Sequence, residues 1–119
     1  MPTYALFLRD EDGHTDRMAP DEFAAHFEKF VAWAEQLERE GRLRGVRRLA
    51  DREGRTVRRR AGALVIDGPY VEGKEAVLGF YLVDAADEEE AWRIAGQCPT
   101  VDTGGSVEVR LVGDFPQAG

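Results

Sequence analysis

Cysteine, histidine and long apolar runs are scarce in this 119-residue chain, and each scarcity excludes a class of structure. The one cysteine, Cys98, cannot form a disulfide within the chain, and two histidines without a Cys-x-x-Cys pattern do not favour a structural zinc site. No apolar run approaches the about 20 residues that a membrane helix requires. The segment Met1 to Tyr4 lacks the features of a secretory signal. We therefore expect a cytoplasmic protein without a metal, a cofactor or a membrane partner.

Basic charge is also in deficit, with 16 lysines and arginines against 23 acidic residues and a net charge of −7. Binding to phosphate backbones needs a continuous basic surface, so nucleic acid is not an expected partner. Arginines nevertheless crowd the stretch from Arg42 to Arg60. We interpret them mainly as solvated strand and turn surface, and an anionic ligand or an acidic partner surface is the alternative.

Hydrophobic residues make up 43% of the chain and charged residues 33%, a composition that supports a packed core. The length suits one domain over residues 1–119, with its core at about 3–113. Runs of apolar or alternating residues predict the strands. These strands are Tyr4 to Leu8, an edge strand Leu43 to Ala50, a hairpin of Val57 to Arg60 and Ala63 to Ile66 about Ala61-Gly62, Leu78 to Val83, and Ser106 to Val112.

Two amphipathic helices are predicted between these strands. The first begins at Pro20 and ends at Gly41, and the second begins after Asp87, whose pairing with Glu90 is a capping signature, and ends at Pro99. The first has an apolar face of Phe23, Phe27, Phe30, Ala34 and Leu37, and the second one of Ala91, Trp92, Ala95 and Cys98. The order of elements predicts an α+β fold, a ferredoxin-like βαββαβ antiparallel sheet with an extra hairpin.

The central strands have apolar residues at both odd and even positions, so both faces of the sheet are apolar, and this pattern predicts a homodimer. Ala5 and Phe7 alternate with Leu6 and Leu8, and Phe80 with Tyr81 in the same way. Two helices cover one face of such a sheet, so the other face stays apolar and uncovered. A two-fold partner packed against that sheet face is the common way to bury it.

The stretch Asp67-Gly68-Pro69-Tyr70-Val71-Glu72-Gly73-Lys74-Glu75, followed by Leu78 to Asp84, resembles the signature of the YCII-related family in its DGPF branch. Further similarity covers Pro20 to Phe23, Cys98-Pro99 and Gly105 to Arg110. The resemblance implies a dimeric α+β barrel, an architecture similar to that of muconolactone isomerases. It names no reaction, because one fold hosts unrelated chemistries. Some members occur beside genes for alternative sigma factors, which implies a role near transcription regulation.

The chain departs from the family pattern at two positions. Relatives carry a histidine eleven residues before the glycine that ends the first helix, where this chain has Phe30. YCII-type members carry an acidic residue before the proline that follows the second helix, where this chain has Cys98. His26 lies one helical turn before Phe30 and is the nearest substitute.

His26 and Asp67 are the candidate proton-transfer residues. The imidazole of His26 could move a proton near neutral pH, and a boundary histidine with a solvated tip is the alternative. Asp67 could act together with the ionisable groups that follow it, or could simply hydrogen-bond the turn of Gly68 and Pro69. Ion pairing of Lys74 with Glu72 or Glu75 is the structural alternative for those groups.

The leading hypothesis is a cofactor-free enzyme or binder of a small molecule, with a pocket between the first helix and the sheet. The residues expected at the pocket rim are Phe30, Trp33, Pro69, Tyr70, Glu72, Lys74, Glu75 and Phe80. The alternative hypothesis is a non-catalytic dimeric interaction protein linked to transcription regulation.

Overall fold

The structure is a computed structural model that describes residues 1–10, 18–50, 54–67 and 76–114. Its elements are β1 (Thr3–Asp10), α1 (Pro20–Arg39), β2 (Leu43–Arg48), β3 (Thr56–Arg60), β4 (Ala63–Asp67), β5 (Ala76–Asp84), α2 (Glu88–Ala95), the short 3-10 helix η2 (Pro99–Thr103) and β6 (Ser106–Leu111).

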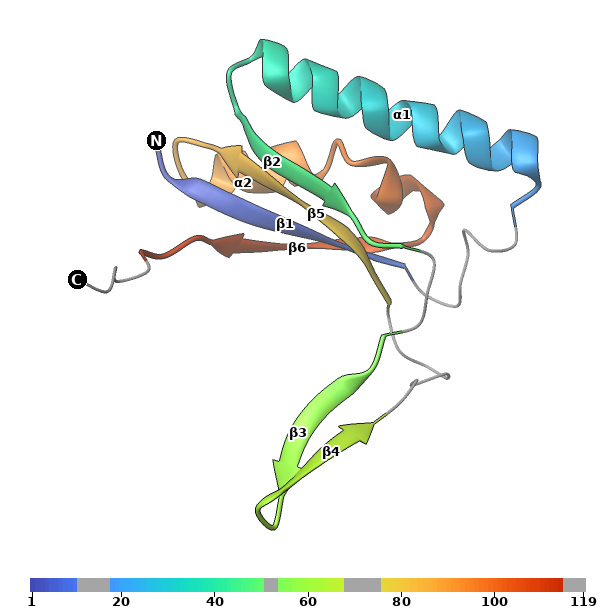
Figure 1. Ribbon diagram of the computed structural model, residues 1–119. Coiled ribbons are helices and arrows are strands. Elements are labelled where there is room, and N and C mark those ends of the chain that lie inside the picture. Colours follow the sequence, from blue (N-terminus) through green and yellow to red (C-terminus); the bar gives the residue numbers. More distant parts are fainter. Residues whose placement is uncertain (11–17, 51–53, 68–75, 115–119) are drawn as a thin grey trace.

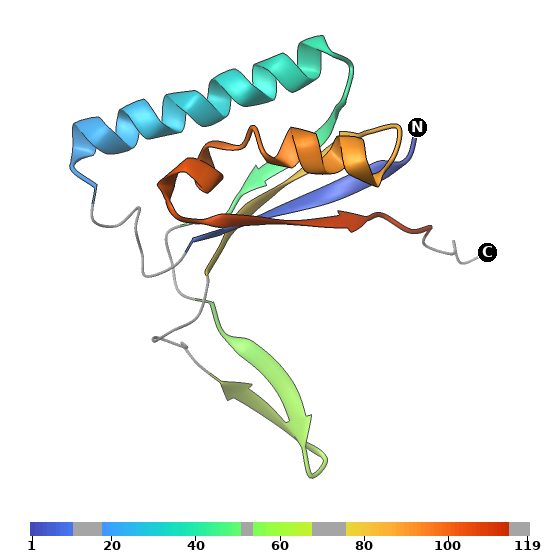
Figure 2. The same cartoon turned by 180° about the vertical axis from the view of Figure 1, so that it is seen from behind.

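Four strands form one antiparallel sheet in the order β2-β5-β1-β6. The strands β3 and β4 pair only with each other, as a separate hairpin inserted between β2 and β5. Both helices lie on one side of the sheet, and the hairpin extends to the other side (Figures 1 and 2). This arrangement confirms the predicted ferredoxin-like α+β fold with an extra hairpin, and β2 is the predicted edge strand.

The core lies between the sheet and the helices, because alternate residues of β1 and β5 point to the same face. Its buried members are Tyr4, Leu6, Leu8, Trp33, Leu37, Tyr81, Val83, Ala85, Ala91, Ile94, Ala95 and Cys98. Neither helix of the described chain is long and apolar enough to cross a membrane.

Helix α2 begins as the sequence predicts and buries a different face. The Asp87 carboxylate accepts a hydrogen bond from the Glu90 amide at 2.8 Å, which confirms the capping signature. The prediction that Trp92 belongs to the buried face is wrong, since its side chain is 55% exposed. Ile94 is buried in its place, because the stripe that runs from Ala91 to Ala95 includes position 94 and excludes position 92.

Helix α1 packs on the sheet with its C-terminal half only. Trp33 and Leu37 are buried, whereas Phe27 is 44% exposed. The predicted apolar face is confirmed for Phe30, Ala34 and Leu37, which pack on the core, whereas Phe23 and Phe27 line a cavity instead. The N-terminal half of α1 stands above the sheet (Figure 1). The aromatic side chains of this half line a space between helix and sheet.

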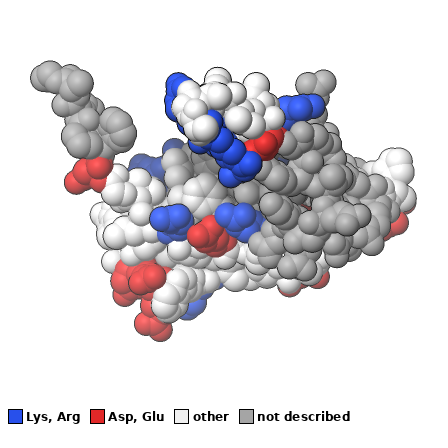
Figure 3. All heavy atoms as spheres, turned by 90° about the horizontal axis from the view of Figure 1, so that it is seen from below, with Lys and Arg blue, Asp and Glu red and all other residues white. Residues whose placement is uncertain are grey.

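The other sheet face has an apolar centre and charged edges. Directly paired residues of neighbouring strands share a face, so one row across the sheet reads Arg47, Phe80, Phe7 and Glu108. The next row reads Gly45, Leu82, Ala5 and Arg110. The rings of Phe7 and Phe80 lie 6.3 Å apart and both residues are half-buried. Seen from below, the molecule shows basic and acidic groups beside one another near its centre, with uncharged surface around them (Figure 3).

Candidate functional site

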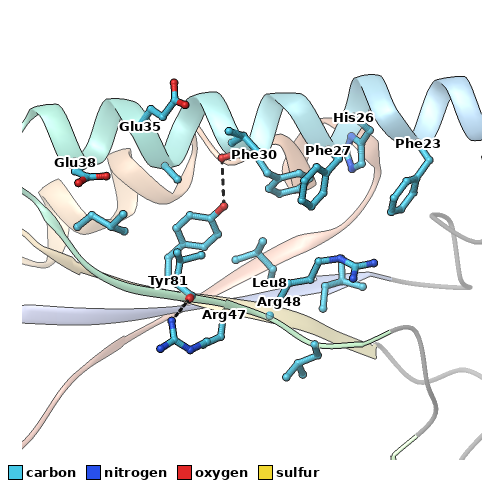
Figure 4. A pocket seen from close by; sticks show the side chains of 17 residues that line it. Leu8, Phe23, His26, Phe27, Phe30, Glu35, Glu38, Arg47, Arg48 and Tyr81 are labelled. Carbon is cyan, nitrogen blue, oxygen red and sulfur yellow. Dashed lines mark hydrogen bonds between the residues drawn. The ribbon is translucent and has the colours of Figure 1, made fainter.

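A cavity of about 430 Å³ lies between α1 and the strands β2 and β5 (Figure 4). Its position agrees with the pocket expected from the sequence. Most of its wall is apolar, which suits a ligand with substantial apolar surface. The lining residues are Leu8, Phe23, His26, Phe27, Phe30, Val31, Ala34, Glu35, Glu38, Leu43, Val46, Arg47, Arg48, Leu49, Leu78, Gly79 and Tyr81.

The polar groups of the cavity come from both of its walls. His26 lies on α1, with its ring edge-on to Phe30 and the two ring centroids 4.9 Å apart. Arg48 comes from β2, and its guanidinium carbon lies 5.8 Å from the centre of the Phe23 ring. The Glu35 carboxylate points away from the space below the helix (Figure 4). An imidazole and a guanidinium are therefore the nitrogen groups that flank the aromatic end of the cavity.

Tyr81 forms the floor of the cavity beneath α1. Its ring packs on Trp33 with centroids 4.5 Å apart, and its hydroxyl donates to the Phe30 carbonyl oxygen at 3.4 Å. Removal of the phenol from water, together with the nearby Cys98 thiol, raises the pKa of Tyr81 to about 12. The hydroxyl therefore stays protonated over the whole neutral range and serves as a donor.

We expect Tyr81→Phe to make folding stability less sensitive to high pH. The folded-state pKa of about 12 exceeds the ordinary value of 10.0, so the stabilising contribution is complete below pH 10 and is lost as pH rises towards 12. The loss in the wild type should reach at most about 2.5 kcal/mol. Urea denaturation of both proteins at pH 8 and at pH 11.5 measures it. A difference in unfolding free energy between the two proteins that is the same at both pH values would contradict the burial of this phenol.

The structure brings few of the predicted site residues together. His26 and Phe30 both line the cavity. Asp67 ends β4 in the separate hairpin, where its carboxylate lies 2.9 Å from the Arg58 guanidinium and 3.5 Å from that of Arg60. His26 and Asp67 thus do not share this cavity.

Two predicted rim residues have other positions. Trp33 is buried in the core, where its indole nitrogen donates to the Gln97 side-chain oxygen at 3.4 Å. Phe80 belongs to the sheet face that is turned away from α1. The other rim residues expected from the sequence lie outside the described residues; they are Pro69, Tyr70, Glu72, Lys74 and Glu75.

Sequence reasoning missed most of the cavity wall. Phe23 and Phe27 were assigned to helix packing, because periodicity identifies the apolar face of a helix and not its distance from the sheet. One signal was available. Three phenylalanines lie within two turns at the start of α1, whereas the packed half of the same helix carries the smaller Ala34 and Leu37 beside Trp33.

The arginine-rich segment divides among three roles. Arg42 contacts Glu90 at 2.6 Å and Arg44 contacts Asp84 at 2.6 Å, so both join β2 to neighbouring parts of the fold. Hydrogen bonds from Thr3 and Arg44 hold the pKa of Asp84 below its usual value. Arg47 and Arg48 line the cavity, and the hairpin carries Arg58, Arg59 and Arg60.

No cluster of three or more His, Cys, Asp or Glu side chains suited to a metal ion occurs in the part of the chain that the structure describes. Among the apolar residues of the cavity wall, the imidazole of His26 and the guanidinium group of Arg48 are on the side of the sheet that faces α1, whereas the Arg47 side chain points away from the cavity (Figure 4). Such a wall can orient a partly apolar molecule and can exchange a proton with it through His26.

Comparison with known proteins assigns the family. The model of the YCII-related domain matches residues 3–116. The chain belongs to the YCII-related family. An uncharacterised protein of Rhizobium meliloti (strain 1021) is 33% identical over 110 residues, which cover 90% of this chain and 89% of that protein. The family match thus extends over the sheet, both helices and the hairpin of this YCII-related protein.

Proposed function

We propose that this YCII-related protein binds a small, mainly apolar molecule between α1 and the sheet and transfers a proton on it without a cofactor. The cavity of about 430 Å³ carries the proposal, because apolar space of this size beside a sheet is where small ligands are commonly held. Phe23, Phe27 and Phe30 would contact the apolar part of the ligand.

His26 is the proposed proton-transfer group. An imidazole holds and releases protons near neutral pH, and this one lies within the cavity wall beside the Phe30 ring. Arg48 at the same end would favour a ligand with a negative charge or a developing negative charge.

The ligand proposal is tested with 1-anilinonaphthalene-8-sulfonate, a fluorescent probe with aromatic rings and an anionic group. We expect Ala34→Phe to fill the cavity and to raise the probe's Kd at least about tenfold. Ala32→Phe is the matched control, since Ala32 lies on the exposed side of the same helix and outside the cavity. Equal Kd values for both variants would place the probe elsewhere and contradict the cavity as a binding site.

The role of His26 is tested by NMR of the histidine ring protons, with His26→Gln used to separate their signals from those of His14. We expect the His26 signals to shift when the probe is added to the wild type and to stay in place with Ala34→Phe. If the His26 ring signals do not shift although the probe binds, His26 does not belong to the ligand site. Failure of all binding would favour a non-catalytic interaction protein instead.

We also propose that the protein belongs to the DGPF branch and forms a two-fold homodimer, the dimeric α+β barrel, through its uncovered sheet face. Phe7, Phe80 and Leu82 at the centre of that face, between charged edges, resemble the apolar centre and polar rim of protein interfaces. The DGPF assignment rests on the motif that begins at Asp67, most of which lies outside the described residues.

A further inference from the structure

The β3–β4 hairpin has one apolar face and one ionic face. Val57 pairs with Ile66, and Arg59 pairs with Leu64, so these four residues share a face. Val57 is 57% exposed, and Leu64 and Ile66 are each 60% exposed. Three large aliphatic side chains therefore stand in solvent on one side of a two-stranded ribbon. Such a ribbon alone is marginally stable in water.

The opposite face carries ion pairs that join the two strands of the hairpin. Asp67 contacts Arg58 and Arg60 across the two strands, at 2.9 and 3.5 Å. The connecting turn has Ala61 at φ 50° and Gly62 at φ 80°, which are the two positive angles of a type I′ turn. The ribbon is thus preorganised, although its aliphatic face is uncovered.

The hairpin and the uncovered sheet face lie on the same side of the molecule. The hairpin extends from the sheet on the side away from α1 (Figures 1 and 2), which is also the side of Phe7 and Phe80. A second molecule that covers the sheet face therefore lies within reach of the hairpin. One two-fold operation would place each hairpin on the other copy.

Charge also favours a second copy as the partner. Residues 54–67 contain four arginines and one aspartate, a net charge of +3, whereas the whole chain has −7. The remainder of the chain therefore has −10, so the hairpin of one copy is attracted to the body of another.

The sheet centre alone is small for a stable dimer. It offers Ala5, Phe7, Phe80 and Leu82, all of them already buried or half-buried in the single chain. Stable interfaces bury about 800 Å² on each partner, so additional surface is needed.

We propose that the β3–β4 hairpin is an intermolecular arm, whose aliphatic face of Val57, Leu64 and Ile66 packs on a second copy of this chain. The inference rests on the proposed dimer and adds to it the element that completes the interface. Each subunit then supplies a sheet face and an arm.

The contact is tested by replacing Leu64 with the photoreactive residue p-benzoylphenylalanine and irradiating a mixture of ¹⁴N- and ¹⁵N-labelled protein. We expect a covalent dimer on a denaturing gel, with cross-linked peptides of mixed isotope content. The same replacement at Ala63, which lies on the ionic face, is the matched control and should give much less product. Cross-links confined to single chains would overturn the proposal.

The energetic contribution is tested by sedimentation of the double variant Leu64→Ser, Ile66→Thr. We expect its dimer Kd to rise at least about tenfold with the circular dichroism spectrum unchanged. Suppose that the wild type is dimeric and that Phe80→Asp dissociates it. An unchanged dimer Kd of the double variant, together with the absence of interchain cross-links, would then overturn the arm, while the sheet-face dimer would still be supported. A monomeric wild type would overturn both. Interchain cross-links with an unaffected Phe80→Asp dimer would support the arm and overturn the sheet-face contact.

Discussion

Gly79→Ala should lower the free energy of unfolding by about 2–4 kcal/mol. Gly79 is buried in β5, and a Cβ atom built there overlaps the backbone carbonyl oxygen of Arg47 in β2. Backbone cannot move aside as a flexible side chain can. The methyl group would force β2 away from β5 or distort the strand that carries it.

The same substitution in the neighbouring strand is the control. At Gly45 an added Cβ would lie 3.5 Å from Leu82 Cδ1, an ordinary van der Waals contact. We expect Gly45→Ala to change stability by less than about 1 kcal/mol, since alanine replaces glycine in a strand at little cost. Urea denaturation of both variants at one protein concentration measures the difference. Equal stability of the two variants would contradict the close contact between Gly79 of β5 and the Arg47 carbonyl oxygen of β2.

Gly79 also lines the cavity, together with its neighbour Leu78 and with Arg48, the residue of β2 that pairs with it. The Leu49 amide donates to the Leu78 carbonyl oxygen at 2.8 Å, so the chain just after β2 is hydrogen-bonded to β5. If the probe binds in the cavity, Gly79→Ala should weaken the binding of the probe and also lower the stability of the fold.

Phe80→Asp should raise the dimer Kd at least about a hundredfold. The substitution removes an aromatic ring from the centre of the proposed interface and buries a carboxylate opposite the partner sheet. An unpaired buried charge costs several kcal/mol, and a hundredfold change corresponds to about 2.7 kcal/mol. Sedimentation over a range of concentrations measures the Kd.

Trp92→Asp is the matched control for this prediction. It places the same carboxylate at an exposed aromatic position on α2, on the helix side of the sheet. We expect its Kd to stay within about twofold of the wild type. Equal behaviour of the two variants, or a wild type that stays monomeric at high concentration, would contradict assembly through the sheet face.

Local patterns predicted the elements because each pattern has a local cause. The strict alternation of β6 reflects one half-buried face, and Val107 and Val109 do pack on the core. The start of α2 follows from the Asp87 cap, and the hairpin turn follows from Ala61-Gly62. Such signals depend on a few neighbouring residues and need no knowledge of the rest of the fold.

The site was harder to predict because it depends on distances between elements. Proximity in sequence grouped Asp67 with the loop that follows it, whereas the strand pairing places its carboxylate among the arginines of β3. The cavity exists because α1 leaves the sheet towards its N-terminus, and no periodic pattern encodes that separation. Phe27 has the same helical spacing whether it is packed or exposed.

Cys98 gives this protein a practical property. It is the one thiol of the chain, it is fully buried behind α2, and burial raises its pKa. Maleimide and methanethiosulfonate reagents, which require an accessible thiolate, should therefore leave the native protein unmodified. A cysteine introduced at a surface position would then be the single labelling point for a spin label or a fluorophore, so separations between subunits could be measured without removing the native cysteine.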